Sequence, residues 1–298
     1  MIISVIISTY NRCESLKDTL DSLLNQERDD NFDYEVIVVD NNSSDKTKEV
    51  VVESYMPQFN GRLRYLFQPK QGKSYALNLA ITKADGEIIA FTDDDCIAAS
   101  DWLLRIKEEF VTADADCVLG MSFWLDENGN INKTIRERKD FLIGNGLNMS
   151  LKKSALVDVN FFDENLGPGV IGGAAEDMDL IYRISSVNKT VIFSQKPKIY
   201  HKPRLSHKHA MSLIDRDLKG YYFFLLKHAI TKKDIYALKR IYWHMSGVLL
   251  SLFDAVKSGN KEYLRLKILQ FNSSVVGLIK GIYIWTVFIH FRQRDAKI

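Results

Sequence analysis

Residues 86–96 read GEIIAFTDDDC. The apolar segment is typical of a buried strand, and it ends in three adjacent carboxylates, Asp93, Asp94 and Asp95. Neighbouring like charges repel and are costly to desolvate unless a cation lies among them. Carboxylate oxygens at a strand end suit Mg²⁺ or Mn²⁺. The alternative is a surface loop that leads to a helix capped near Asp101.

Strands and helical patterns alternate around this stretch. The strand-like segments are SVIIST (4–9), YEVIVVD (34–40), RLRYLFQ (62–68) and GEIIAFT (86–92). Leucines at helical spacing follow the first strand, and helices are expected over 45–55 and 74–84. This rhythm predicts an α/β fold with a doubly wound, mainly parallel sheet. Ligands bind such sheets at the carboxyl ends of the strands. Polar clusters stand at three of these ends: Thr9-Tyr10-Asn11, Asp40-Asn41-Asn42 and Asp93–Asp95.

The second half of the chain is less regular. CVLGMSFWL (117–125) predicts a strand, and 141–156 predicts a loop, a strand and the start of a helix. A Gly-rich segment within 166–185 runs into a helix and predicts a mobile segment over a site. After Pro203 the sequence is mostly helical, aromatic and basic. We therefore expect one α/β domain over 1–205 and a helical extension over 206–298.

Charge is unevenly distributed along the chain. Residues 1–200 hold 22 Lys and Arg against 32 Asp and Glu, and residues 201–298 hold 18 against 6. An acidic body with a basic tail indicates a cation-assisted site in the first part and an anionic partner for the second. The alternative is two surfaces that attract each other. The acidic front and the lack of a known motif argue against nucleic-acid binding.

Other candidate residues allow two interpretations each. Asp40 ends a strand and could bind a base or ribose, or it could be a turn residue beside Asp45, a helix cap. Glu176 and Asp177 open a helix and could be ordinary first-turn acids or a general base at a cleft. His201 could be an exposed histidine or a metal ligand.

The combination of motifs resembles the family 2 glycosyltransferases with the A-type glycosyltransferase fold, over about residues 1–205. The motifs that carry the resemblance are VIISTYNR, VIVVDNNSSDKT, the run from GKSYALNLAITKAD to IIAFTDDD, GLNMSLKKSAL and AAEDMDLIYRI. That family transfers a sugar from a nucleotide diphosphate sugar to an acceptor hydroxyl, with inversion at the anomeric carbon. The resemblance implies this activity, with Mn²⁺ or Mg²⁺, a UDP-sugar donor and a glycan or lipid-linked acceptor in cell-surface polysaccharide synthesis.

The resemblance also implies roles for individual residues. Asp177 matches the catalytic base, supported by Glu176, and Asn148 matches an asparagine near the sugar or acceptor. Asp95 matches the direct metal ligand, with Asp93 in the metal shell and His201 completing the site. The implied donor nucleotide contacts are Ser8, Thr9, Tyr10, Asn11, Asp40, Asn42, Lys73, Asp93 and Asp94.

The sequence departs from the family pattern in two places. Cys96 stands where relatives usually carry an acid or polar group, and no QxxRW segment follows Glu176-Asp177, which argues against the processive branch. One alternative function is a nucleotidyltransferase that makes an activated sugar, but STYNRCES lacks the glycines of a phosphate loop. Another is a non-catalytic sugar- or nucleotide-binding module, against which Glu176-Asp177 argues.

The tail and the cysteines bear on location. Residues 261–294 are apolar, aromatic and basic, but Lys280 interrupts the run, so we expect a membrane-surface or dimer-forming helix rather than a span. The three cysteines show no CxxC spacing and are expected to be small core residues. With no signal peptide visible, they favour a cytoplasmic protein, on the inner face of the membrane if the tail contacts lipid.

Overall fold

The computed structural model describes residues 1–29, 31–126, 128–135, 146–202 and 207–295. The chain divides into two compact units. The α/β unit comprises Met1–Glu164 and Glu176–Pro203, and the helical unit comprises Asn165–Ala175 and Arg204–Ile298. The boundary at Pro203 lies close to the expected one at 205. The segment Asn165–Ala175, which the sequence placed in the first domain, groups with the C-terminal helices.

The N-terminal half of the α/β unit has the predicted alternation. Its strands are β1 (Ile2–Thr9), β2 (Asp33–Asp40), β3 (Leu63–Phe67) and β4 (Ile88–Asp93), parallel to one another in the order β3-β2-β1-β4. Its helices are α1 (Cys13–Leu24), α2 (Thr47–Glu49) with a π-helix over Val50–Tyr55, and α3 (Lys73–Lys83). The helix expected over 45–55 thus becomes a π-helix at three successive valines, whose β-branched side chains crowd an α-helix.

The second half extends the same sheet with strands of both directions. The strands are β5 (Cys96–Ala98), β6 (Cys117–Leu125), β7 (Ile131–Ile135), β8 (Met149–Lys152) and β9 (Val191–His201). The helical elements are α4 (Trp102–Thr112), a 3₁₀ turn (Gly146–Asn148), α5 (Lys153–Asp158) and α6 (Glu176–Ser186). β8 runs antiparallel to β4 and β6, while β9 runs parallel to β6. The expected strand at 117–125 is confirmed, as are the strand and the helix start expected within 141–156. Residues 141–145 of that stretch lie outside the described residues.

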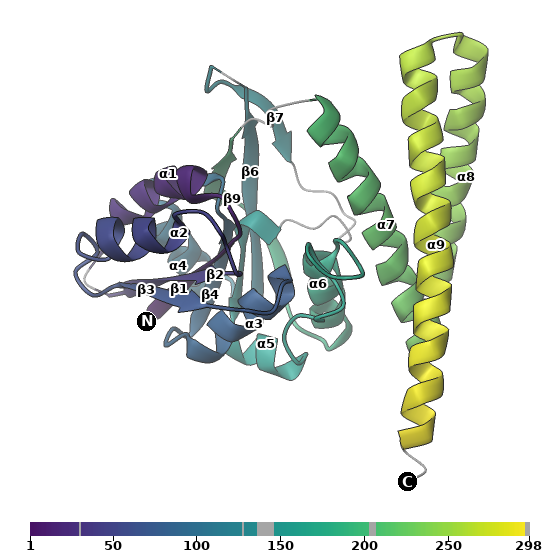
Figure 1. Cartoon of the computed structure of the whole chain (residues 1–298). Helices are drawn as coiled ribbons and strands as arrows, with labels where there is room; N and C mark the ends of the chain where they lie inside the picture. The colour runs from purple at the N-terminus through teal and green to yellow at the C-terminus, as the bar shows by residue number, and fades with distance from the viewer. Residues whose placement is uncertain (30, 127, 136–145, 203–206, 296–298) are drawn as a thin grey trace. The chain divides into compact units, whose positions relative to one another are not determined.

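Helices cover the two faces of this sheet (Figure 1), and a cluster of buried apolar residues lies on each face. Alternate residues of β1 point to opposite faces, so Ile3, Val5 and Ile7 pack with α1, the π-helix and α4, whereas Ile6 packs with α3, α5 and α6. Both faces are buried, which explains why the central strands are continuous apolar runs. The doubly wound arrangement expected from the sequence is confirmed, and it leaves the carboxyl ends of β1, β2 and β4 at one edge.

The helical unit contains α7 (His207–Thr231), α8 (Ile235–Ser258) and α9 (Lys261–Asp295). On α9, Gly277 and Gly281 lie where a Cβ would meet α7 at 3.0 Å and 2.6 Å, so the glycines permit close packing of the two helices. The Trp285 indole is buried and donates to the Phe223 carbonyl at 3.1 Å. Among the described residues, no helix has both the length and the apolar character that crossing a bilayer requires.

Candidate active site

Strand register brings the predicted polar clusters together at one edge of the sheet. Thr9 at the end of β1 is the register partner of Asp40 at the end of β2, and Ser8 is the partner of Asp93 at the end of β4. Three clusters that are far apart in the sequence therefore end beside one another. This is the edge at which the sequence predicts a ligand site.

Lys73 reaches this edge because the loop before α3 is held in place. The Asn41 amide donates to the carbonyls of Gln68 and Lys70 and accepts from the Gly72 N–H at 2.8 Å. Gly72 has φ of 137°, a conformation that side-chain-bearing residues rarely adopt, and it immediately precedes the helix. Lys73 is then the first residue of α3. Asn41 was not among the predicted site residues, and it acts on the site through this loop.

A pocket in the α/β unit contains Lys73 and three carboxylates. The Lys73 ammonium lies 2.7 Å from Asp93 Oδ1 and 3.4 Å from Glu176 Oε1. The pocket is lined by Lys73, Leu77, Phe91, Thr92, Asp93, Gly146, Met149, Phe162, Glu176 and Asp177. Strand β4, helix α3 and helix α6 thus each contribute charge to one apolar-walled pocket. An ammonium between carboxylates can neutralise them or pair with a bound anion.

In this pocket, burial and the charge of Lys73 shift the pKa of the carboxyl groups in opposite directions. For Asp93, burial raises the pKa, but the attraction and hydrogen bond of Lys73, with smaller contributions from His201 and Arg12, together lower the carboxyl pKa. For Glu176 and Asp177, burial is the larger effect and the pKa of each is raised despite the attraction of Lys73. Raised carboxyl pKa values in a pocket are a property of general acids and bases.

The Asp177 carboxylate has a fixed orientation. Its Oδ2 accepts from the Gly146 N–H at 2.9 Å, and its Oδ1 accepts from the Met178 N–H at 2.8 Å. A Cβ on Gly146 would lie 2.9 Å from Asp177 Oδ2, so no larger residue fits there without a shift. The sequence identified Asp177 but not Gly146, although the GLN motif that begins with it was noted.

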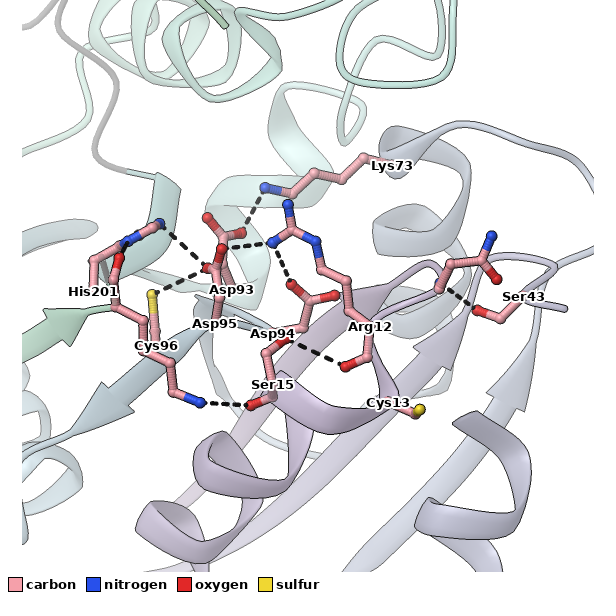
Figure 2. Close-up of polar contacts among 12 residues, drawn as sticks. Arg12, Cys13, Ser15, Ser43, Lys73, Asp93, Asp94, Asp95, Cys96 and His201 are labelled. Atoms are coloured by element: carbon pink, nitrogen blue, oxygen red, sulfur yellow. Dashed lines mark hydrogen bonds and ion pairs between the residues drawn. The ribbon is translucent and has the colours of Figure 1, made fainter. Parts of the chain in front are cut away.

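Arg12 is the residue that sequence reasoning missed. Its Nη1 lies 3.1 Å from Asp94 Oδ1 and 2.5 Å from Asp95 Oδ2, so one guanidinium joins both carboxylates (Figure 2). Burial raises the Asp94 pKa to about 7, even though Arg12 lowers it. The sequence did contain an indication of this role. Arg12 closely follows the first strand, so it is expected at the same edge of the sheet as the three acids Asp93–Asp95.

Asp95 and His201 face each other at the other side of this cluster. His201 Nε2 lies 3.3 Å from Asp95 Oδ1, and Cys96 Sγ lies 3.9 Å from the same oxygen (Figure 2). His201 Nδ1 lies 2.7 Å from the Lys202 carbonyl, which can only accept, so Nδ1 carries a proton. A neutral imidazole would therefore direct an Nε2 lone pair at a carboxylate. Such an Nε2 lone pair facing a carboxylate oxygen is favourable only if a proton or a metal ion lies between the two atoms.

The donor set fits a divalent cation. Ligand atoms of Asp95, Cys96 and His201 all lie within 4.8 Å of one another. A carboxylate with an imidazole suits Mn²⁺ better than Mg²⁺, which prefers oxygen ligands. Burial raises the pKa of the Cys96 thiol well above its usual value, so Cys96 binds a metal only if the metal displaces its proton. Cys96 and Cys117 are buried as expected, whereas Cys13 is only partly buried.

The remaining predicted donor residues form the surrounding loops. Asp40 is buried and accepts from the Ser43 N–H and the Tyr65 hydroxyl, each at 2.8 Å. Asn11 Oδ1 accepts from the Ser44 N–H at 2.7 Å and joins the loops after β1 and β2. Tyr10 and Asn42 are exposed, Ser8 is partly buried and Thr9 is buried. The contacts of these residues with a donor nucleotide stay a prediction.

Asn148 lies in the core, with its amide fully engaged. Its Oδ1 accepts from the Trp102 indole at 2.9 Å, and its Nδ2 donates to the carbonyls of Met121 at 2.8 Å and Pro197 at 3.1 Å. The side chain is only 1% exposed. These contacts give Asn148 a structural role, and its contact with a sugar or acceptor stays a prediction.

Sequence comparisons identify related proteins. The model of glycosyl transferase family 2 matches residues 4–162. Glycosyltransferase AglE of Haloferax volcanii is 33% identical over 56% of this chain and 55% of that protein. The GalNAc(5)-diNAcBac-PP-undecaprenol beta-1,3-glucosyltransferase of Campylobacter jejuni is 30% identical over 54% of this chain and 55% of that protein. The chain thus spans about half the length of these curated relatives.

Solved structures share the fold. A Pyrobaculum calidifontis mannosyltransferase in complex with GDP-Man and Mn²⁺ superposes with a TM-score of 0.65 at 18% identity, over 94% of this chain and 87% of that one. S. aureus TarS 1-349 in complex with UDP-GlcNAc gives a TM-score of 0.59 at 16% identity, over 97% and 92%. At these identities the likeness shows the fold, which is the A-type glycosyltransferase fold expected from the sequence.

The contacts of Asn148 yield a stability prediction. Asn148→Ala leaves one buried donor and two buried acceptors without partners, so we expect the free energy of unfolding to fall by at least about 2 kcal/mol. Chemical denaturation measures this, with the exposed Asn25→Ala as the control that should change little. A stable Asn148→Ala protein with a weakened acceptor interaction would instead support the predicted role near the acceptor.

Proposed function

The chain belongs to glycosyl transferase family 2, and on that premise we propose that it transfers a sugar from a UDP-sugar to an acceptor hydroxyl with inversion at the anomeric carbon. The observation that carries the proposal is the pocket in which Lys73 lies between Asp93 and Glu176, with Asp177 beside them. Such a pocket supplies a cation for a diphosphate and a carboxylate for an acceptor proton.

Asp177 is the proposed base. Glu176 faces Lys73, whereas the Asp177 carboxylate is oriented by two backbone N–H groups. Asp177 takes the proton of the acceptor hydroxyl, whose oxygen forms a bond to the anomeric carbon. The bond from that carbon to the diphosphate oxygen breaks, and the nucleotide diphosphate leaves with the electron pair. Lys73 is placed to stabilise the charge that develops on the diphosphate.

Asp95 and His201 are the proposed ligands of a divalent cation, Mn²⁺ or Mg²⁺. When bound, the ion supplies positive charge for the leaving diphosphate. Arg12 holds Asp94 and Asp95 on the other side and limits their mutual repulsion. The Pyrobaculum mannosyltransferase, named as a complex with GDP-Man and Mn²⁺, supports a metal in this fold.

The acceptor is proposed to be a glycan, carried on a lipid and used for a cell-surface polysaccharide. The undecaprenol-linked glycan in the name of the Campylobacter relative supports this class. We also propose that the helical unit contacts the membrane surface where such an acceptor would lie. The exposed apolar residues of α8 support that contact; Tyr242 is 69%, Trp243 58%, Leu250 67% and Phe253 58% exposed.

Charge favours a membrane over a second copy of the chain as the partner of α8. Residues 201–298 carry 18 Lys and Arg against 6 Asp and Glu. Two copies facing each other through this part would bring like charges together, which is unfavourable. Anionic headgroups attract basic residues, and exposed Trp, Phe and Leu can insert at the lipid interface.

The base assignment predicts a separation of binding from rate. Asp177→Asn keeps the shape of the side chain but removes its basicity, so kcat should fall by roughly 10²–10⁴ while UDP binding survives. Glu176→Gln should be milder. Because burial raises the Asp177 pKa, wild-type kcat should rise with pH through a value above the ordinary carboxyl value of about 4. An active Asp177→Asn with an inactive Glu176→Gln would transfer the role to Glu176.

The metal assignment predicts coupled binding. In thermal-shift measurements UDP should stabilise the wild type more with Mn²⁺ than without it, and GDP should do so less than UDP. Asp95→Asn should abolish the contribution of Mn²⁺ and lower kcat, and Asp101→Asn, outside the cluster, should change neither. Unchanged Mn²⁺ dependence and activity in Asp95→Asn would rule out this ligand.

The membrane contact predicts salt-sensitive vesicle binding. The full chain should float with phosphatidylcholine vesicles that contain phosphatidylglycerol, and added salt should weaken the interaction. Leu250→Ser with Phe253→Ser should reduce binding, whereas Val111→Ser, which changes an exposed valine of the α/β unit, should not. If the wild type ignores anionic vesicles, or dimerises through α8, the proposal fails.

A further inference from the structure

The chain passes from the helical unit to the α/β unit at the proposed base. The segment Asn165–Ala175 belongs to the helical unit, and Glu176, the next residue, is the first residue of α6 in the α/β unit. The carboxylates Glu176 and Asp177 are therefore joined covalently, without any linker, to a segment that the C-terminal helices hold. The importance of this junction rests on the function proposed for Asp177.

The segment Asn165–Ala175 is closed on itself by backbone hydrogen bonds. The Gly172 N–H donates to the Asn165 carbonyl at 2.9 Å, and the Gly167 N–H donates to the Ala174 carbonyl at 3.2 Å. Leu166 is fully buried. A Cβ on Gly172 would lie 2.5 Å from the Asn165 carbonyl oxygen, so this glycine permits a close approach of backbone. Gly172 thus has a packing role, and the mobility that the sequence predicts for this segment stays a prediction.

Gly220 on α7 is where this segment meets the helices. A Cβ added to Gly220 would lie 2.7 Å from the Ala174 Cβ and 2.9 Å from the Ala174 backbone. Distances below 3.0 Å cannot be accommodated unless one of the two backbones shifts. Ala174 itself is buried. The end of the segment therefore lies directly against the α7 backbone, one residue before Ala175.

Ala175 has a strained backbone. Its φ of 69° is in the left-handed region, which costs free energy for a residue with a Cβ. Such a conformation persists only where the surrounding structure determines it, and these outliers concentrate at functional sites. Here the outlier lies between the Gly220 contact and the first turn of α6. A change in the Ala175 backbone would redirect that turn and the Asp177 side chain.

We propose that Gly220, Ala174 and Ala175 form a positioning device that sets where α6 begins and therefore the position of Asp177, whose carboxylate the Gly146 and Met178 N–H groups then orient. The contact of Ala174 with Gly220 fixes one end of the device, and the left-handed Ala175 fixes the direction in which α6 begins. The helical unit is then required for the rate of transfer, and any membrane contact it makes is a separate property. Donor and metal binding depend on Lys73, Asp93 and Asp95, which the device does not include.

The first test is Gly220→Ala in the full chain. Displacing a base by about 1 Å can cost roughly 100-fold in rate, so we expect kcat to fall at least 10-fold while the donor KM and the affinity for UDP with Mn²⁺ stay unchanged. The acid limb of kcat should also move to lower pH as Asp177 and Glu176, beside Lys73, become less buried. Gly247→Ala is the matched control, because nothing lies within 4 Å of its added Cβ on α8.

Ala175→Gly is the second variant, and it covers the case in which Gly220→Ala does not fold. Glycine adopts the left-handed conformation without strain and also leaves it freely, so the protein should stay folded while kcat falls and UDP affinity is retained. Lys233→Gly is its control, because Lys233 also has a positive φ, 53°, and is exposed.

Each outcome decides the proposal. Wild-type kcat and pH profile in Ala175→Gly would overturn it, and so would a loss of UDP affinity in proportion to rate. If Asp177→Asn keeps full activity, the failure lies in the base assignment. If Asp177→Asn is inactive and both device variants match their controls, the failure lies in the positioning device.

Discussion

Five carboxylates, those of Asp93, Asp94, Asp95, Glu176 and Asp177, lie beside the end of β4, and the need to compensate their charge governs the structure around them. Lys73 lies between Asp93 and Glu176, and Arg12 joins Asp94 to Asp95. Each cation comes from the start of a helix, α3 for Lys73 and the residue before α1 for Arg12. The loop contacts of Asn41 hold Lys73 in place beside these acids. A divalent cation at the proposed ligands Asp95 and His201 would add further positive charge.

The sequence predicted the parts of the fold that depend on local pattern. Continuous apolar runs identified β1, β2 and β4, and the rule that ligands bind at the carboxyl ends of parallel strands placed Asp93 and Asp95 at the site. The sequence did not predict the order of β8, β6 and β9, because pairing between segments that are distant in the chain has no local signature, whether the strands run antiparallel, as for β8, or parallel, as for β6 and β9. The π-helix over Val50–Tyr55 was missed because its apolar spacing resembles that of an α-helix.

The site residues show a second reason why the sequence does not predict the whole site. Asn41 and Asn148 belong to motifs that suggest ligand contact, yet both amides are hydrogen-bonded within the protein, Asn41 to backbone groups and Asn148 to two backbone carbonyls and the Trp102 indole. A polar residue type shows that a partner is needed, but it does not show whether the partner is a ligand or a carbonyl. Arg12 is the opposite case. It lies within the VIISTYNR motif, and only its contacts with Asp94 and Asp95 assign it to the acidic cluster.

The division of the chain also affects how such proteins can be recombined. The backbone enters the helical unit at Asn165, returns to the α/β unit at Glu176 and leaves it again after Pro203. Because the chain passes between the units three times, no single cut separates them. A chimera that exchanges only the C-terminal helices between relatives would pair foreign helices with the native Asn165–Ala175 segment. The unit that has to be exchanged as a whole is therefore discontinuous. A chimera must include residues 165–175 together with the C-terminal helices that they pack against.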